Sequence, residues 1–117
     1  KLKVCAAHGG GYLPSYAPRS DHGCFISPQG CDPNIVLKKK PTEYLKQLYF
    51  DSLVFTSEAL RHIVAQVGSS QIMIGTDAPI PWNEHPVDHI MGTATLSDKQ
   101  KIAILGGNAA KMLGIKS

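Results

Sequence analysis

The stretch Gln71-Ile-Met-Ile-Gly-Thr-Asp-Ala-Pro79 combines a short apolar run with a carboxylate at its end. Ile72 to Ile74 predict a buried strand. Pro79 and Pro81 then prevent regular pairing, because proline has no backbone N–H to donate. Asp77 is therefore placed where the strand ends. In folds that alternate strands and helices, ligands bind outside the carboxyl ends of the strands, so Asp77 is a candidate for chemistry.

Two further strands are predicted upstream of this stretch. Residues 2–7 form an apolar run that ends at His8, and residues 49–55 are rich in strand-forming residues. Helices are indicated by capping residues and by apolar residues at helical spacing. We expect helices over residues 41–48, 57–67, 87–91 and 98–105, then a break at Gly106-Gly107, and a last helix capped by Asn108.

Residues 12–40 show no sustained periodicity and contain Pro14, Pro18, Pro28 and Pro33. We expect a long loop here, and loops of that length in compact domains are usually functional or disordered.

The alternation of strands and helices predicts an α/β fold with a parallel sheet covered by helices, in a single domain over residues 1–117. Three strands are too few to complete a doubly wound sheet or a barrel. Right-handed crossovers place the carboxyl ends of all strands on one edge. His8, the residues after Phe55, and Asp77 should then face a common crevice, and Asp51 and Ser52 could point into a barrel interior.

Composition narrows the class of protein. The chain has 117 residues, 43% of them hydrophobic and 18% charged, which describes one ordinary globular domain. The net charge of +3 is scattered apart from Lys38-Lys39-Lys40, which has no aromatic residue between its charges, so we expect no nucleic-acid partner. No apolar run has membrane-spanning length, and we expect no membrane partner.

The three cysteines, Cys5, Cys24 and Cys31, cannot all pair within one chain. A reduced, cytoplasmic protein is the simpler interpretation. A small loop closed by Cys24 and Cys31 remains open if the compartment is oxidising.

His8 followed by Gly9-Gly10-Gly11 is the second informative feature. One interpretation is a histidine bonded to backbone at a tight glycine turn. A second is the oxyanion hole of lipases, but that class needs a Gly-x-Ser-x-Gly elbow, which this sequence lacks. A third is metal-assisted chemistry, in which Asp77 binds a divalent metal and His8 transfers a proton. One carboxylate cannot hold a catalytic zinc, which needs about three protein ligands.

The other candidate ligands are weaker. His85 and His89 have the spacing of zinc proteases, but Pro86 stands where those enzymes have a glutamate, so a solvated helix start is favoured. The set His22, Cys24 and Cys31 matches no zinc spacing well. His62 lies beside the apolar face of its helix and is expected to be structural.

Arg19 follows His8 among small residues, and a guanidinium there could hold a substrate carboxylate through two hydrogen bonds. A simply solvated arginine is the competing interpretation. Ile80 and Trp82 could form an apolar pocket wall or pack in a core.

Five short motifs carry a family resemblance, and they occur in one order over nearly the whole chain: residues 5–11, 19–23, 49–52, 72–79 and 107–115. Together they resemble the C-terminal part of the branch of the amidohydrolase superfamily that includes aminocarboxymuconate-semialdehyde decarboxylase. The resemblance implies a metal-dependent, TIM-type β/α barrel, of which this chain supplies the last three strand–helix units.

The resemblance also implies roles. Asp77 matches a metal ligand at the end of the eighth strand, and His8 matches an acid or base at the end of the sixth. Arg19 matches an arginine that binds a substrate carboxylate and can reach across a dimer interface. The implied enzyme is a decarboxylase or hydrolase of a small carboxylic acid, a homo-oligomer, with zinc as the metal and manganese as the alternative.

The sequence departs from the family pattern at one important point. It contains no His-x-His pair, which supplies metal ligands from the first strand of such barrels. We therefore expect either a fragment of a longer protein or a truncated remnant. A non-catalytic part-barrel or interaction module is the alternative function. The open edge of a part-barrel should need the remainder of the barrel or a second subunit.

Overall fold

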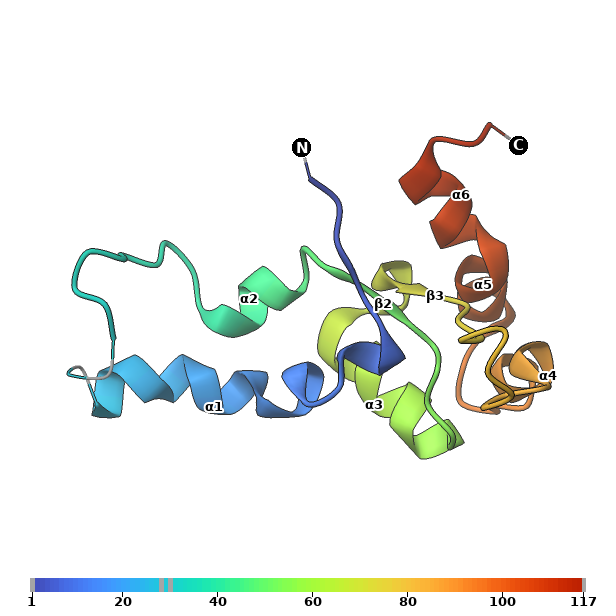
Figure 1. The fold of residues 1–117 in the computed structure, drawn as a ribbon, viewed down its shortest axis with the longest axis horizontal. Coiled ribbons are helices and arrows are strands. Elements are labelled where there is room, and N and C mark those ends of the chain that lie inside the picture. The colour runs from blue at the N-terminus through green and yellow to red at the C-terminus, as the bar shows by residue number, and fades with distance from the viewer. Residues whose placement is uncertain (1, 28, 30, 117) are drawn as a thin grey trace.

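The computed structural model describes residues 2–27, 29 and 31–116, without the side chains of Cys24 and Phe25 (Figure 1). Its strands are short and its helices alternate with them. In chain order the elements are β1 (Cys5–Ala6), α1 (Leu13–Ile26), α2 (Pro41–Leu45), β2 (Tyr49–Asp51), α3 (Ser57–Val67), β3 (Ile72–Met73), α4 (Pro86–Met91), α5 (Asp98–Ile102) and α6 (Asn108–Leu113). None of the helices in the described ranges combines the length and apolarity needed to cross a membrane.

The strands form a parallel sheet in the order β1-β2-β3. Cys5 pairs with Tyr49, and Phe50 pairs with Ile72. This confirms the predicted α/β alternation and the parallel sheet, although the paired segments are shorter than expected. β2 ends at Asp51, and the Leu53 N–H donates to the Asp51 carboxylate at 3.0 Å rather than to a neighbouring strand. All three carboxyl ends lie at one edge of the sheet.

The core lies between the sheet and its covering helices. α3 has the predicted form: Thr56 Oγ1 accepts the Ala59 N–H at its start, and Gly68 follows its end with φ +89°. The buried apolar side chains of the core form one cluster: Phe50, Leu60, Ile63, Val67, Ile72, Ile90, Leu96 and Ile104. Full burial of an apolar side chain contributes about 1.5–3 kcal/mol, so this cluster is the main source of stability.

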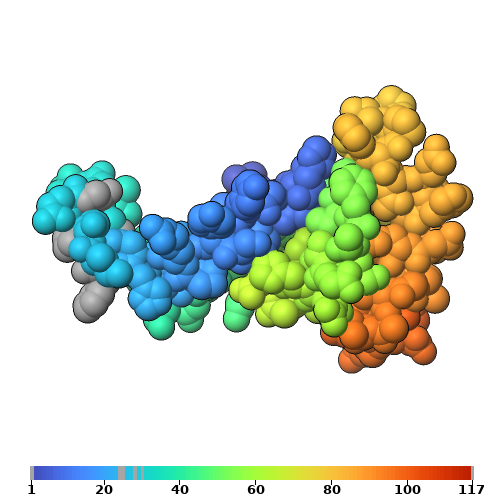
Figure 2. Space-filling model, turned by 90° about the horizontal axis from the view of Figure 1, so that it is seen from below, coloured from blue at the N-terminus to red at the C-terminus, as the bar shows by residue number. Residues whose placement is uncertain are grey.

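Residues 12–40 contain the helix α1, so the prediction of one long loop is wrong. Pro14 is compatible with the helix because it lies in the first turn, where backbone N–H groups have no partner in any case. Among the described side chains of α1, the buried ones are Pro14 and Ala17, which do not make a pronounced apolar period. Further along, Thr42 donates its N–H and its hydroxyl to Asp21, at 2.9 and 2.7 Å, and joins α2 to α1. The two helices extend from the sheet as an arm (Figures 1 and 2).

The C-terminal helices also differ from expectation. The Ser97–Gln100 capping box is confirmed at the start of α5. The chain does not break at Gly106-Gly107, because residues 103–107 form a π-helical segment that runs on into α6. Asn108 is not a cap either: its backbone is helical, and its buried side chain donates to Ser69 O at 2.7 Å and to Ile72 O at 2.6 Å. Glycine can adopt helical angles, and here packing overrides its low helix propensity.

The π-helical segment also contacts β3. Ile74 N–H donates to Ile104 O at 2.9 Å, whereas the inner side of β3 is bonded to β2 through Ser52 N–H and Met73 O, at 2.8 Å. Because successive carbonyls of a strand face opposite sides, Ile72 O and Ile74 N–H face away from β2. At these two residues the outer side of β3 is thus occupied by Asn108 and Ile104.

Candidate active site

His8 and Asp77 come together at the carboxyl ends of the strands. His8 directly follows the exit from β1 and Asp77 follows β3, and His8 Nε2 lies 3.5 Å from Asp77 Oδ2. The histidine side chain is 60% exposed and the aspartate side chain 28% exposed. An imidazole and a carboxylate thus share an accessible position, as expected from the parallel topology.

Both residues have left-handed backbone, with φ +56° at His8 and +57° at Asp77. Left-handed conformations cost a residue other than glycine about 1–2 kcal/mol and, where they persist, are often found at functional sites. His8 begins a run of positive φ that continues through the three glycines after it. At Gly10 a Cβ atom would lie 2.6 Å from the Phe50 ring, so glycine is needed for space as well as for conformation.

The carboxylate of Asp51 holds the turn that carries His8. Its Oδ2 accepts the His8 N–H at 2.9 Å, and its Oδ1 accepts the Gly9 N–H at 2.8 Å. Ser52, which is buried, accepts the Gly75 N–H at 3.3 Å. Sequence reasoning gave Asp51 no such role. The one available signal was a carboxylate inside a strand, where aspartate is disfavoured.

A hollow of about 250 Å³ lies beside His8 and is lined by His8, Leu53, Phe55 and Trp82. Its wall is largely apolar, and the two aromatic side chains are 65% and 60% exposed. Of the two interpretations left open for Ile80 and Trp82, the pocket wall fits Trp82, whereas Ile80 is exposed and does not line this hollow. A hollow of about 300 Å³ between α1 and α2, lined by residues such as Tyr16 and Leu45, lies on the arm and includes neither His8 nor Asp77. The hollow beside His8 is therefore the better candidate for chemistry.

Arg19 is not part of this arrangement within the chain. It belongs to α1 and lines a separate hollow on the arm with Pro18, His22 and Ile26 among its neighbours. Its predicted contact with a substrate carboxylate remains a prediction.

The described residues contain no group of three or more His, Cys, Asp or Glu side chains that could hold a metal ion. Asp77 offers one carboxylate, a suitable oxygen ligand for a divalent cation, and further ligands would have to come from outside the described residues. The weaker zinc set of His22, Cys24 and Cys31 and a disulfide between Cys24 and Cys31 both require the Cys24 side chain, which lies outside the described side chains.

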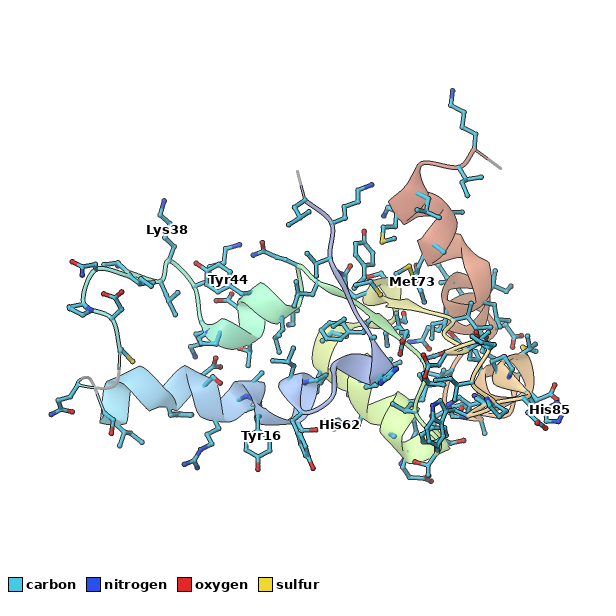
Figure 3. All side chains as sticks on the ribbon, viewed as in Figure 1. Tyr16, Lys38, Tyr44, His62, Met73 and His85 are labelled. Carbon is cyan, nitrogen blue, oxygen red and sulfur yellow. The ribbon has the colours of Figure 1, made fainter. Side chains whose placement is uncertain are left out.

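Three further histidines lie in α3 and at α4. His85 is exposed at the start of α4, at the outer edge of the molecule, with its Nδ1 3.8 Å from Asp88 Oδ2 (Figure 3). His89 is half-buried, and this burial lowers the pKa of its imidazole below the ordinary value. His62 lies next to the start of α1, where its Nε2 is 3.1 Å from Ser15 Oγ (Figure 3).

Two curated proteins resemble nearly the whole chain. The 2-amino-3-carboxymuconate-6-semialdehyde decarboxylase of Dictyostelium discoideum is 39% identical over 115 residues, which are 97% of this chain and 32% of that protein. The protein of the same name from Caenorhabditis elegans is 37% identical over 116 residues, 98% of this chain and 28% of that protein. The chain therefore spans about a third of the length of the curated relatives it matches.

Solved structures share the fold. The 5-carboxyvanillate decarboxylase of Sphingomonas paucimobilis is 28% identical with a TM-score of 0.84, over 98% of this chain and 34% of that one. A dihydroxybenzoic acid decarboxylase from a Polaromonas species, solved with bound manganese and an inhibitor, is 24% identical with a TM-score of 0.79, over 97% of this chain and 34% of that one. A model of the amidohydrolase family matches residues 1–115. The chain belongs to the amidohydrolase family.

Proposed function

We propose that the chain is the C-terminal portion, the last three strand–helix units, of a TIM-type β/α barrel that decarboxylates a small carboxylic acid with the help of a divalent metal. The observation that carries this proposal is the approach of His8 to Asp77 at the carboxyl ends of a parallel sheet. The curated relatives and the solved structures compared above are named as decarboxylases. A hydrolase of the same superfamily is the alternative reaction.

In this proposal Asp77 is one metal ligand, and the bound metal supplies a positive charge that polarises the substrate. Manganese is the metal named for the Polaromonas protein, and zinc is the alternative for this chain. Decarboxylation breaks the C–C bond between the substrate carboxylate and the carbon that bears it. The electron pair stays on that substrate carbon until a proton takes the place of the lost CO₂. His8 is well placed to move this proton, because its imidazole is accessible beside the carboxylate of Asp77.

The hollow beside His8 indicates the kind of acid. Phe55 and Trp82 offer exposed aromatic surface there, and aromatic side chains pack well against planar, unsaturated or aromatic groups. Arg19 lies apart from His8 in one chain, so we propose that it binds a carboxylate in the site of a second copy within a homo-oligomer. A bidentate guanidinium is suited to that contact.

The remainder of the barrel would supply the other metal ligands. The DNA upstream of the codon for Lys1 decides between the enzyme and the alternative function, a non-catalytic remnant. A strand with a His-x-His pair there supports the enzyme. A start codon directly upstream of the Lys1 codon supports the remnant, whose missing ligands motivate that alternative.

The direct test uses the full-length gene product. CO₂ release is measured with a panel of aromatic and unsaturated carboxylic acids, and bound metal is measured by elemental analysis. We expect Asp77→Asn to lose bound metal and CO₂ release together, and His8→Asn to keep the metal but lose CO₂ release. Asp88→Asn is the matched control, because Asp88 is an 83% exposed carboxylate on α4. The assignment fails if Asp77→Asn leaves metal content and activity unchanged.

A further inference from the structure

The end of the central strand carries a polar group that the proposed chemistry does not use. Asp51 is the last residue of β2, which lies between the strands that lead to His8 and to Asp77. We propose that Asp51 is a positioning residue: its carboxylate fixes the His8 turn so that the imidazole meets Asp77 in the geometry that proton transfer requires. This inference rests on the proposed function of His8.

The hydrogen bonds of the turn support this role. Gly10 N–H donates to Ala7 O and Gly11 N–H donates to His8 O, both at 3.0 Å, so the turn satisfies these two groups internally. The N–H groups of His8 and Gly9 instead donate to the two oxygens of Asp51. Hydrogen bonds to a carboxylate are about twice as strong as neutral ones.

The strain at His8 makes such a hold necessary. A left-handed residue other than glycine persists only where its surroundings determine its conformation, and His8 has φ +56°. Among the described residues, the acceptor of the His8 backbone N–H is Asp51 Oδ2, at the end of β2. Loss of these bonds should let the His8 backbone relax and move the imidazole.

Asp51 also contacts the segment that leads to Asp77. At Gly75 a Cβ atom would lie 2.7 Å from Asp51 Cβ and 2.8 Å from its carboxyl carbon. No side chain fits there without displacing the carboxylate. The glycine therefore leaves the space that Asp51 occupies, and Asp51 lies between the two segments whose side chains approach to 3.5 Å.

The test compares two variants of the full-length gene product that disturb the Asp51 carboxylate in different ways. Asp51→Asn keeps the shape of the side chain but replaces one acceptor oxygen with an NH₂ group, which would face a backbone N–H. Gly75→Ala keeps the carboxylate and pushes it aside. Since a misplacement of about 1 Å can lower a rate about 100-fold, we expect both variants to lower kcat by about that factor with nearly unchanged KM. Gly106→Ala is the matched control, because a Cβ there meets nothing within 4 Å.

Amide hydrogen exchange provides a readout that does not depend on activity. In Asp51→Asn we expect faster amide exchange at His8 and Gly9 and unchanged exchange in α3. A global loss of stability would instead speed exchange in α3 as well. Unchanged kcat in both variants, or unchanged exchange at His8 and Gly9, overturns the proposal. If Asp51→Asn fails to fold, Gly75→Ala decides by the same two readouts. A parent protein that releases no CO₂ refutes the proposed function instead, and exchange then still shows whether Asp51 holds the turn.

Discussion

Asn108 offers a sharp test of how the C-terminal helix is attached to the sheet. The side chain donates two hydrogen bonds, to Ser69 O and Ile72 O, from a position only 7% exposed. In Asn108→Ser the shorter side chain reaches neither carbonyl. Each lost bond costs about 1 kcal/mol net, so we expect the free energy of unfolding to fall by about 2 kcal/mol. A helix cap would behave differently, because serine caps about as well as asparagine.

The assay is urea unfolding of the full-length gene product, followed by circular dichroism. Lys111→Ser is the control, since it places the same residue at an exposed position of α6 and should cost about 0.5 kcal/mol through helix propensity alone. If Asn108→Ser and Lys111→Ser lower the free energy of unfolding equally, the two buried bonds do not contribute as described.

Two further predictions concern conformation and pH. Gly10→Ala adds a clash with the Phe50 ring to the cost of a left-handed backbone and should lower the free energy of unfolding by about 2–5 kcal/mol. The control Gly114→Ala, at φ +72°, meets nothing within 4 Å and should lower it by about 1–2 kcal/mol. Equal losses of unfolding free energy in urea would contradict the clash. Burial lowers the pKa of His89 in the folded state, so the unfolded chain takes up the proton first as pH falls. Stability should therefore decline as pH falls below the unfolded value of about 6.5, and His89→Gln should decline less; parallel profiles of the free energy of unfolding would argue against this.

The sheet and α3 could be predicted because their signals are local. α3 has buried Leu60, Ile63 and Val67 on one face, with a capping threonine before it and a glycine after it. The approach of His8 to Asp77 could be predicted from topology, since parallel strands bring their carboxyl ends to one edge. His8 and Asp77 lie together as that argument requires.

The features that sequence reasoning missed depend on contacts between distant segments. Among the described side chains of α1, Pro14 and Ala17 are buried and Asp21 makes a polar contact to Thr42, so these residues give no clear apolar period. The proposed role of Asp51 depends on backbone N–H groups in the turn that follows β1. A single sequence holds no record of such pairings.

At the glycine pair before Asn108, sequence reasoning predicted a helix end that the structure does not have. Gly106-Gly107 has the composition of a helix end, yet the helix continues as a π segment because Ile104 and Asn108 are anchored to the sheet. Each anchoring contact offsets part of the low helix propensity of glycine. Local propensity thus gives way to tertiary contacts.

The occupied outer side of β3 has a consequence for how copies of the chain can associate. Exposed strand edges recruit strands from other molecules, and repeated head-to-tail pairing between two different edges builds filaments. Here Asn108 and Ile104 already bond Ile72 O and Ile74 N–H, so further sheet pairing at these residues would first have to displace the helix. In the closed barrel proposed above, β3 would pair with the first strand along this same side, so closure there would require the C-terminal helix to release both bonds.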